Sequence, residues 1–270
     1  MKLNHIFLSC ISAALLASCS EYDDPADRFT EVPDVTPVSR VLMAEFTGQL
    51  CSNCPTAHEK IEDYERLFGD YFICVSIHGD NTMMGLPVNS PMGLGTEQGV
   101  KYNELFKVEL WPNAVVNWKS GALGSDYGKW VSKLVEGMIR PTDIDLSASA
   151  SMPTDSTITV DVRIRSDKAQ PGTRFNIWLS EDSIVGMQLM PNGAPDPKYV
   201  HNGVFRKALC GIEGEDVAII ANVEASESRS TVIDPKWNPE NMNAVVFVYT
   251  ESAGVTSVIK TKVKPFAKPE

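Results

Sequence analysis

The chain has 270 residues, which is long for one domain and comfortable for two. It carries 24 basic and 35 acidic residues, a formal net charge of −11 at pH 7. Because an acidic protein repels phosphate backbones, these counts argue against nucleic acid as a partner. No Ser-His-Asp order, glycine-rich phosphate loop or His-Glu-x-x-His sequence is present, so hydrolase and nucleotide-binding functions have no support.

The N-terminus predicts a lipoprotein signal peptide over residues 1–18. Lys2 supplies the positive charge, and residues 6–16 form an apolar core that is too short to cross a membrane. Residues 16–19, LASC, resemble a bacterial lipobox; the alternative is an ordinary secretory signal that ends in Cys. We expect the mature chain to begin at Cys19, acylated on its sulfur and its amine, and to be anchored to a membrane by these lipids.

Residues 19–37 are polar, acidic and proline-containing, which predicts a flexible tether. Glu21, Asp23 and Asp24 closely follow the lipidated cysteine. This arrangement resembles the acidic export signal of surface lipoproteins, which implies an outer-membrane location facing the cell exterior. A solvated linker that happens to be acidic is the alternative.

Residues 41–68 carry the clearest chemistry in the chain. They predict an apolar strand, a turn with Cys51 and Cys54, and an amphipathic helix. Pro55 suits the first helical turn, where its missing N–H costs nothing. Cys51 therefore lies at a helix N-terminus, where the helix dipole favours a thiolate and greater exposure makes it the attacking sulfur. A dithiol at a strand-to-helix junction predicts a thioredoxin-like redox site.

Two further positions strengthen the resemblance to thioredoxins. Glu45 lies six residues before Cys51, where thioredoxins carry a buried acid that deprotonates the second cysteine. Pro112 follows Trp111 and precedes a short apolar strand, which matches the cis-proline that faces the dithiol and presents backbone to a substrate. The chain departs from the thioredoxin pattern at Leu50, where a tryptophan is usual, and at the dipeptide of residues 52–53, SN instead of Gly-Pro.

The rest of residues 38–141 fits the same α/β domain. Residues 71–77 read as a buried parallel strand, so strand, helix and strand form a βαβ unit. His78 then follows the second strand on the dithiol side, as a polar group of the site or as a satisfied strand-end histidine. Residues 96–108 predict a helix, and Ser125 is the expected cap of another.

The cysteines bound the redox state and the metal content. In an oxidising compartment we expect a Cys51–Cys54 disulfide and an inert core thiol at Cys74. A Cys74–Cys210 bridge is the less favoured pairing. A zinc site would need four ligands, and Cys51, Cys54 and His58 supply at most three nearby. We therefore predict no metal and no cofactor.

Beyond Pro141 the hydrophobic period changes to two, which predicts an antiparallel β-sandwich domain over residues 142–270. The alternating sets are Ile144, Leu146, Ala148 and Ala150; Ile158, Val160, Val162 and Ile164; Phe175, Ile177 and Leu179; Val217, Ile219, Ala221 and Val223; and Val245, Phe247 and Tyr249.

The whole pattern resembles the twenty-eight-kilodalton-type outer-membrane lipoproteins of Bacteroides-like bacteria, a thioredoxin-like domain followed by a β-sandwich. The matching residues are Cys51, Asn53, Cys54, Pro55, His78, Tyr102, Phe106, Pro112, Asn117, His201, Asn202 and Arg206. The resemblance implies location and architecture more than activity. His78, Trp111, His201 and Arg206 are candidate binding residues.

Two classes of function stay open on the sequence. One is thiol–disulfide exchange or redox sensing on a protein or peptide substrate, with Cys51, Cys54, Glu45 and Pro112 as its site. The other is a non-enzymatic surface protein for binding or adhesion whose disulfide is a structural staple. The cell surface has no obvious electron donor, which favours the staple, whereas the placement of the acid and the proline favours exchange.

Overall fold

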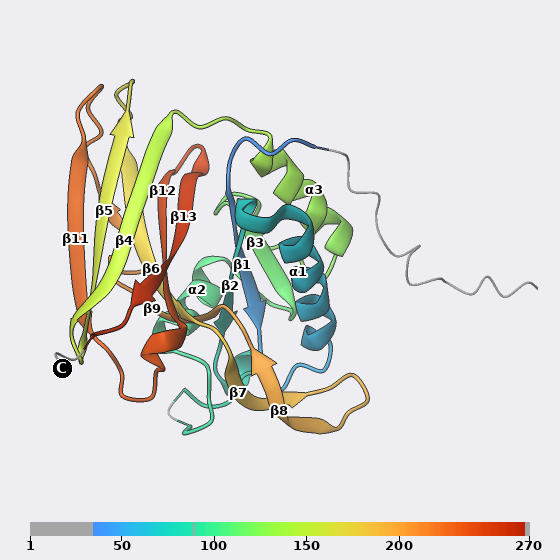
Figure 1. Cartoon of the computed structure of the whole chain (residues 1–270). Helices are drawn as coiled ribbons and strands as arrows, with labels where there is room; N and C mark the ends of the chain where they lie inside the picture. Colours follow the sequence, from blue (N-terminus) through green and yellow to red (C-terminus); the bar gives the residue numbers. More distant parts are fainter. Residues whose placement is uncertain (1–34, 89, 268–270) are drawn as a thin grey trace, which may run out of the picture. The chain divides into compact units, whose positions relative to one another are not determined.

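The structure is a computed structural model, and it describes residues 35–88 and 90–267, which belong to one compact unit (Figure 1). Its α-helices are α1 (Cys54–Phe68), α2 (Glu97–Leu105) and α3 (Tyr127–Met138). Its strands are β1 (Val41–Thr47), β2 (Phe72–His78), β3 (Asn113–Val116), β4 (Ile144–Thr154), β5 (Thr157–Ser166), β6 (Thr173–Glu181), β7 (Ile184–Leu189), β8 (Pro195–His201), β9 (Val204–Ala208), β10 (Glu215–Asp216), β11 (Ala225–Val232), β12 (Met242–Thr250) and β13 (Gly254–Lys264).

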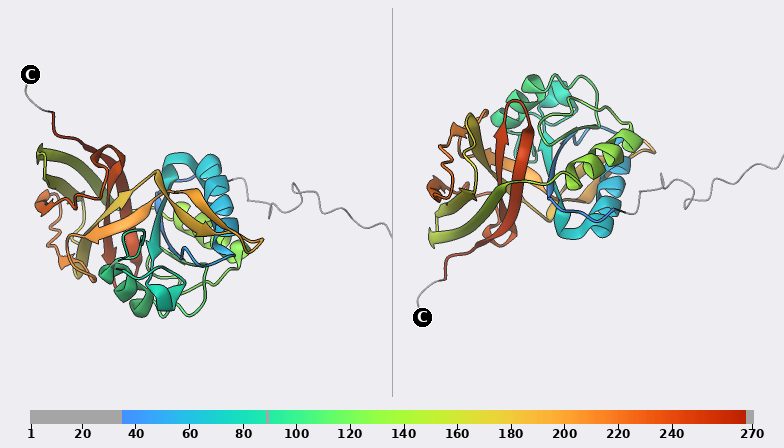
Figure 2. Two further views of the ribbon diagram at one scale, coloured as in Figure 1. Left: turned by 90° about the horizontal axis from the view of Figure 1, so that it is seen from below. Right: turned by 90° about the horizontal axis from the view of Figure 1, so that it is seen from above.

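Strands from both halves of the sequence join one mixed sheet in the order β11-β5-β4-β13-β12-β6-β9-β2-β1-β3, with β10 beside β6. β1 and β2 are parallel, as the sequence predicts, and β3 pairs antiparallel with β1 at the sheet edge. β9 joins the halves through the pairing of Val204 with Ser76. The described fold is therefore mostly β with few helices. Figure 2 shows α1 and α3 together on one face of β1–β3, with α2 apart from them.

The second half of the chain forms two packed β layers. β4, β5 and β11 make one layer, and β6 and β12 belong to the other. The core between the layers contains the predicted inward sets of β4, β5 and β6, among them Ile144, Leu146, Ile158, Val160, Val162, Ile164, Phe175, Ile177 and Leu179. These three sets are confirmed, because period-two patterning identifies the buried face of a strand whose other face is polar.

The strand β12 differs from its prediction in the direction its side chains point. Val245, Phe247 and Tyr249 belong to a second core with the first half, whereas Val246 and Val248 fill the core between the β layers. Both faces of β12 are apolar and buried, so alternation alone could not identify its inner face.

An aromatic cluster fills this second core where the two halves of the sequence meet. The ring of Trp118 stacks on Tyr249 at 5.2 Å and 18°. Trp178 lies 5.0 Å from Tyr102 and 4.9 Å from Phe247, and its indole N–H donates to the Tyr102 hydroxyl at 2.8 Å. Aromatic pairs of this kind add about 0.5–1.5 kcal/mol each beyond their buried area. The cluster therefore fixes the second half against the helices and strands of the first.

Two local predictions are wrong, and one strand was not predicted. The stretch 217–223 is not a strand: Val217 and Ile219 point inward, but only an isolated bridge from Gln170 to Ile219 pairs there. The strand that is present, β11, has a polar ASESRSTV sequence at the sheet edge, so it lacks the apolar alternation used to find strands. Asp126, not Ser125, caps α3, since its side chain accepts from the Lys129 N–H.

The division into domains at residues 141 and 142 stays a prediction, and a fragment of residues 142–270 tests it. We expect this fragment to keep β-type circular dichroism, because the core between its two β layers is internal to it. It should also bind a hydrophobic dye and unfold at a lower temperature than the full chain, because Trp178 and Phe247 lose the cover of Tyr102 and Trp118. A fragment as stable as the full chain would show that the aromatic cluster contributes little.

Candidate functional site

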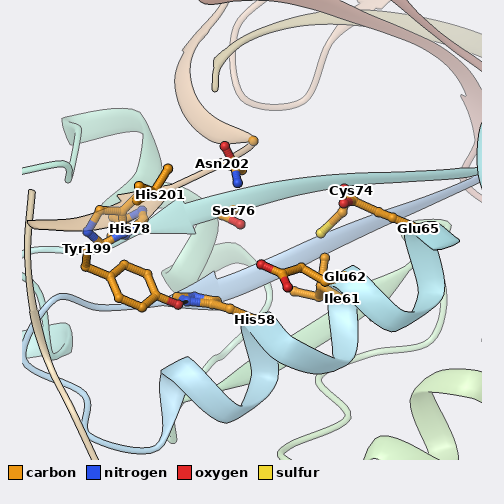
Figure 3. Close-up of a pocket in the computed structure, with 12 residues that line it drawn as sticks. His58, Ile61, Glu62, Glu65, Cys74, Ser76, His78, Tyr199, His201 and Asn202 are labelled. Atoms are coloured by element: carbon orange, nitrogen blue, oxygen red, sulfur yellow. Dashed lines mark hydrogen bonds between the residues drawn. The ribbon is translucent and has the colours of Figure 1, made fainter. Parts of the chain in front are cut away.

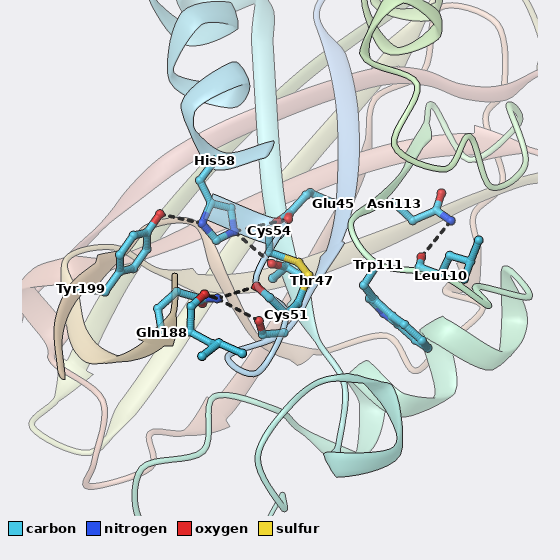
Figure 4. Close-up of a disulfide and its surroundings, with 12 residues drawn as sticks. Glu45, Thr47, Cys51, Cys54, His58, Leu110, Trp111, Asn113, Gln188 and Tyr199 are labelled. Atoms are coloured by element: carbon cyan, nitrogen blue, oxygen red, sulfur yellow. Dashed lines mark hydrogen bonds and ion pairs between the residues drawn. A yellow bond between two sulfur atoms is a disulfide. The ribbon is translucent and has the colours of Figure 1, made fainter. Parts of the chain in front are cut away.

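A disulfide joins Cys51 and Cys54, as the sequence predicts, with their Cα atoms 5.4 Å apart. It lies where the chain leaves β1 and enters α1, and Cys54 is the first residue of the helix (Figure 4). Cys74 and Cys210 are free and buried. Burial raises the pKa of the Cys74 thiol well above its usual value and that of Cys210 to about 11, so both thiols are inert.

Pro112 follows a cis peptide bond from Trp111, and β3 begins directly after it. Pairing of β3 with β1 fixes this bend beside the strand that leads into the disulfide. The Trp111 indole N–H donates to the Asn103 side-chain oxygen at 3.0 Å, which holds the partly buried ring against α2. Figure 4 draws Trp111 and the disulfide in one neighbourhood, so the two sequence-predicted features are brought together.

Glu45 is the acidic group of the site. It lies in β1 and is 0% exposed, and neither of its carboxyl oxygens has a hydrogen-bond partner. The nearest basic group is His58, whose Nε2 lies 3.4 Å from Oε1 of Glu45. A buried carboxylate without hydrogen bonds costs several kcal/mol unless a positive charge compensates it or a proton neutralises it.

His58 connects this acid to the second half of the chain. It lies one helical turn beyond Cys54 on α1, and its Nε2 is 2.9 Å from the Thr47 hydroxyl. Its Nδ1 is 2.8 Å from the hydroxyl of Tyr199, which belongs to β8 (Figure 4). From the sequence His58 is considered only as a possible zinc ligand, although its four-residue spacing from Cys54 places it on the same helix face.

The hairpin β7–β8 covers the disulfide. This hairpin is not predicted from the sequence. The Gln188 amide donates to the carbonyl oxygens of Cys51 at 3.0 Å and Gly48 at 3.2 Å. Leu189 N–H donates to the Gln49 carbonyl at 2.8 Å. The dipeptide at residues 192–193, Asn-Gly, is a common hairpin turn and is the signal that could have found this element.

Under this cover Cys51 is only 5% exposed, and Cys54 is 0% exposed. Cys51 is the more exposed of the two, as its position at the helix start predicts, but the expectation of an open sulfur is wrong. The residues that bury it come from a hairpin more than a hundred residues away in the sequence, so no local pattern reports them.

The three histidines of the described chain gather near this site. His78 and His201 are 2% and 3% exposed, their rings are 5.6 Å apart, and none of their ring nitrogens has a hydrogen-bond partner (Figure 3). Burial lowers the pKa of His78 well below its usual value and that of His201 to about 4, so both rings are neutral. The role of His78 as a polar group of the site stays a prediction. The two rings border a cavity of about 40 Å³ between α1, β2 and β8.

Arg206 forms a buried ion pair with Glu181. Its Nε and Nη2 lie 2.8 Å and 2.7 Å from Oε2 of Glu181, in an ion pair whose side chains are 10% and 4% exposed. This pair lies on β9 and β6 and compensates two buried charges.

Among residues 35–88 and 90–267, no group of three or more His, Cys, Asp or Glu is arranged to hold a metal ion. In the same part of the chain, no helix is both long enough and apolar enough to span a membrane. The predicted signal peptide, Cys19 and most of the predicted acidic tether lie outside the described residues.

Solved structures share this fold. The HBP35 protein of Porphyromonas gingivalis is 14% identical, with a TM-score of 0.65 over 87% of this chain and 79% of that one. The protein AGR_C_4864 from Agrobacterium tumefaciens is 12% identical, with a TM-score of 0.54 over 87% of this chain and 99% of that one. These likenesses concern the fold alone. No curated protein sequence matches the chain.

A domain of the outer membrane lipoprotein Omp28 from Porphyromonas gingivalis is 21% identical, covers 48% of this chain and 94% of that one, and has a TM-score of 0.36. Independently of that structure, the family model of the outer membrane protein Omp28 matches residues 100–266. This match covers more than half of the sequence, and it includes most of α2, all of α3 and all the strands from β3 onward. The chain therefore belongs to the Omp28 family.

Proposed function

We propose that this Omp28-family chain is a lipid-anchored outer-membrane protein whose first half is a thioredoxin-like domain that performs thiol–disulfide exchange at Cys51 and Cys54. Cys51 attacks the disulfide of a protein or peptide substrate, and Cys54 resolves the mixed disulfide. Glu45 takes the proton of Cys54, and Pro112 presents its backbone to the substrate.

The burial of Glu45 carries this proposal. A disulfide that only staples the chain has no need of a fully buried carboxyl group without hydrogen bonds, and such a group destabilises the fold by about 1–3 kcal/mol or more. Buried groups of this kind occur where their chemistry is used. A general base beside a resolving thiol is such a use.

The arrangement of elements around Glu45 supports the same function. A parallel β1–α1–β2 unit places the disulfide at the start of α1, and β3 follows the cis Pro112 antiparallel to β1. Free N–H groups in the first helical turn stabilise a thiolate at Cys51 when the disulfide is reduced.

A structural disulfide is the second candidate function, and the cover over Cys51 favours it. Gln188 and Leu189 donate to the backbone carbonyl groups of Cys51 and of the residues before it, so a substrate must displace the hairpin or approach past it. A binding protein with a rigid, stapled surface needs no such access.

Turnover of a test disulfide separates these functions. We expect the reduced wild-type chain to reduce a peptide disulfide with a thiol regenerating system, and Cys51→Ser to abolish this activity because it removes the attacking sulfur. The measurement is release of peptide thiol over several turnovers. Cys74→Ser is the matched control, since its thiol is buried and inert, and it should retain the activity.

A wild type without turnover, whose disulfide resists dithiothreitol unless the chain is denatured, would identify the bond as a staple. The reduction potential of the Cys51–Cys54 disulfide is an independent test, because structural disulfides usually have potentials below about −300 mV and catalytic ones above.

Lipid attachment at Cys19 is proposed from the lipobox at residues 16–19. We expect Cys19→Ala to leave the precursor unprocessed or to release the chain from the membrane fraction, because acylation at this sulfur supplies the anchor. Fractionation of cells and mass spectrometry of the N-terminal peptide measure both effects. Unchanged acylation in the variant contradicts the assignment.

We also propose that the chain faces the cell exterior, from the acidic residues Glu21, Asp23 and Asp24. Protease added to intact cells should then degrade the protein, whereas an inward-facing protein stays protected until the outer membrane is opened.

A further inference from the structure

Glu45 and His58 together form a buried acid–base pair. The 3.4 Å approach of His58 Nε2 is the closest ion-pair contact of Glu45, and the carboxyl oxygens have no hydrogen-bond partner. An isolated carboxylate at this depth is too costly unless a positive charge or a proton compensates it. A proton shared within the pair, as a carboxylic acid beside an imidazole or as a carboxylate beside an imidazolium, would remove this cost.

His58 also connects Glu45 to solvent. The Glu45 side chain is 0% exposed and the His58 side chain 15% exposed, so a proton on Glu45 can reach water through the imidazole. The Tyr199 hydroxyl orients the ring from the solvent side by its 2.8 Å contact with Nδ1. Burial raises the pKa of Tyr199, so its hydroxyl stays protonated.

The other charged and titratable groups around His58 do not compete with this pair for the proton. His201 on β8 and His78 on β2 are neutral, because burial lowers the pKa of both. Arg206 on β9 is paired with Glu181. Glu62, on the next turn of α1, lines the outer part of the pocket and is exposed to solvent.

We infer that His58 is a positioning residue that shares a proton with Glu45 and carries protons between this buried carboxyl group and solvent. This inference rests on the thiol–disulfide exchange proposed above. It adds a route for the proton that a fully buried base must lose before it can act again.

The proposed exchange accounts for every bond, proton and electron. Cys51 thiolate attacks a substrate disulfide, which forms a mixed disulfide and releases one substrate thiolate. The Cys54 thiol gives its proton to the Glu45 carboxylate, and the Cys54 thiolate attacks the Cys51 sulfur. The Cys51–Cys54 bond forms, and the second substrate thiolate leaves and takes its proton from water. Two electrons pass from the cysteine sulfurs to the substrate disulfide. His58 releases one proton to solvent, so the pair again holds one.

A single-turnover experiment on the reduced full-length chain tests this role. An aromatic disulfide reagent that releases a coloured thiolate reports attack by Cys51 as a first phase and resolution by Cys54 as a second. His58→Gln should leave the first phase unchanged and slow the second about tenfold, because proton transfer by a positioned group contributes at least this much. The second phase should also rise more steeply with pH in this variant, since solvent base must replace the imidazole.

Three further variants separate proton transfer from structural support. Glu45→Gln should slow the second phase as His58→Gln does, and the double variant should be no slower than Glu45→Gln alone, because the two groups act in series. Tyr199→Phe keeps the ring and loses the hydroxyl, so it should slow only the second phase and by less. Glu59→Gln is the control: this exposed residue follows His58 on α1, and both phases should be unchanged.

The alternative results are distinct. If the wild type shows both phases and His58→Gln keeps the rate and pH profile of the second, the role of His58 is overturned and the exchange function stands. Equal slowing of both phases, or additive effects in the double variant, also overturns it, because either result means structural support. A folded wild type that shows neither phase contradicts the exchange function and this role with it.

Discussion

The two-sided burial of β6 and β12 is the constraint on which the rest of the structure depends. One face of these strands closes the core between the β layers, and the other carries Trp178 and Phe247 into the aromatic cluster with Tyr102 and Trp118. A strand buried on both faces cannot slip or rotate without exposing one of its cores. The second half is therefore held in one register against β1 and β2, and the hairpin that follows β6 emerges over the disulfide. The site is thus assembled by packing that lies far from its chemistry.

Within that frame the site concentrates polar groups that the fold does not satisfy. Glu45, His78 and His201 are all at most 3% exposed, and their side-chain oxygens and nitrogens lack hydrogen-bond partners. Each such group costs about 1–3 kcal/mol, which is large against the net stability of a domain. The well-packed cores on either side of β6 and β12 offset this cost. Keeping the histidines neutral limits it further, because a buried imidazolium pair would add repulsion to desolvation.

The sequence predicts features that depend on residues close together in the chain, and it does not predict those that depend on distant residues. The Cys51–Cys54 pair, the helix that begins there and the cis-proline position depend on neighbours within a few residues or on one familiar motif, and each is where the sequence places it. The inward sets of β4, β5 and β6 are also local patterns. Phe247 points to the other core because both faces of β12 are apolar, and the polar β11 offers no pattern at all.

The same distinction between local and distant interactions applies to the candidate site. Glu45 is predicted from its spacing to Cys51 and Pro112 from the strand that follows it, and Figure 4 draws Glu45 and Trp111, the residue before the cis-proline, around the disulfide. The partners that decide accessibility and proton movement, Gln188 and Tyr199, come from the hairpin, and their contacts with the site span more than a hundred residues. Arg206, a candidate binding residue from the family resemblance, forms a buried ion pair with Glu181.

Exchange at the covered disulfide needs access for a substrate, whereas the Glu45–His58 pair needs the hairpin in place. The hairpin β7–β8 contacts both parts of the site. Gln188 holds the hairpin to the Cys51 carbonyl, and Tyr199 from the same hairpin holds His58 beside Glu45. A substrate that displaces the hairpin at Gln188 therefore also disturbs the contact that orients His58. Conversely, with the hairpin in place the acid–base pair is fully assembled while access to the sulfur is restricted. Since both contacts are made by one two-stranded element, access to Cys51 and the arrangement of the proton route are coupled through the position of that hairpin.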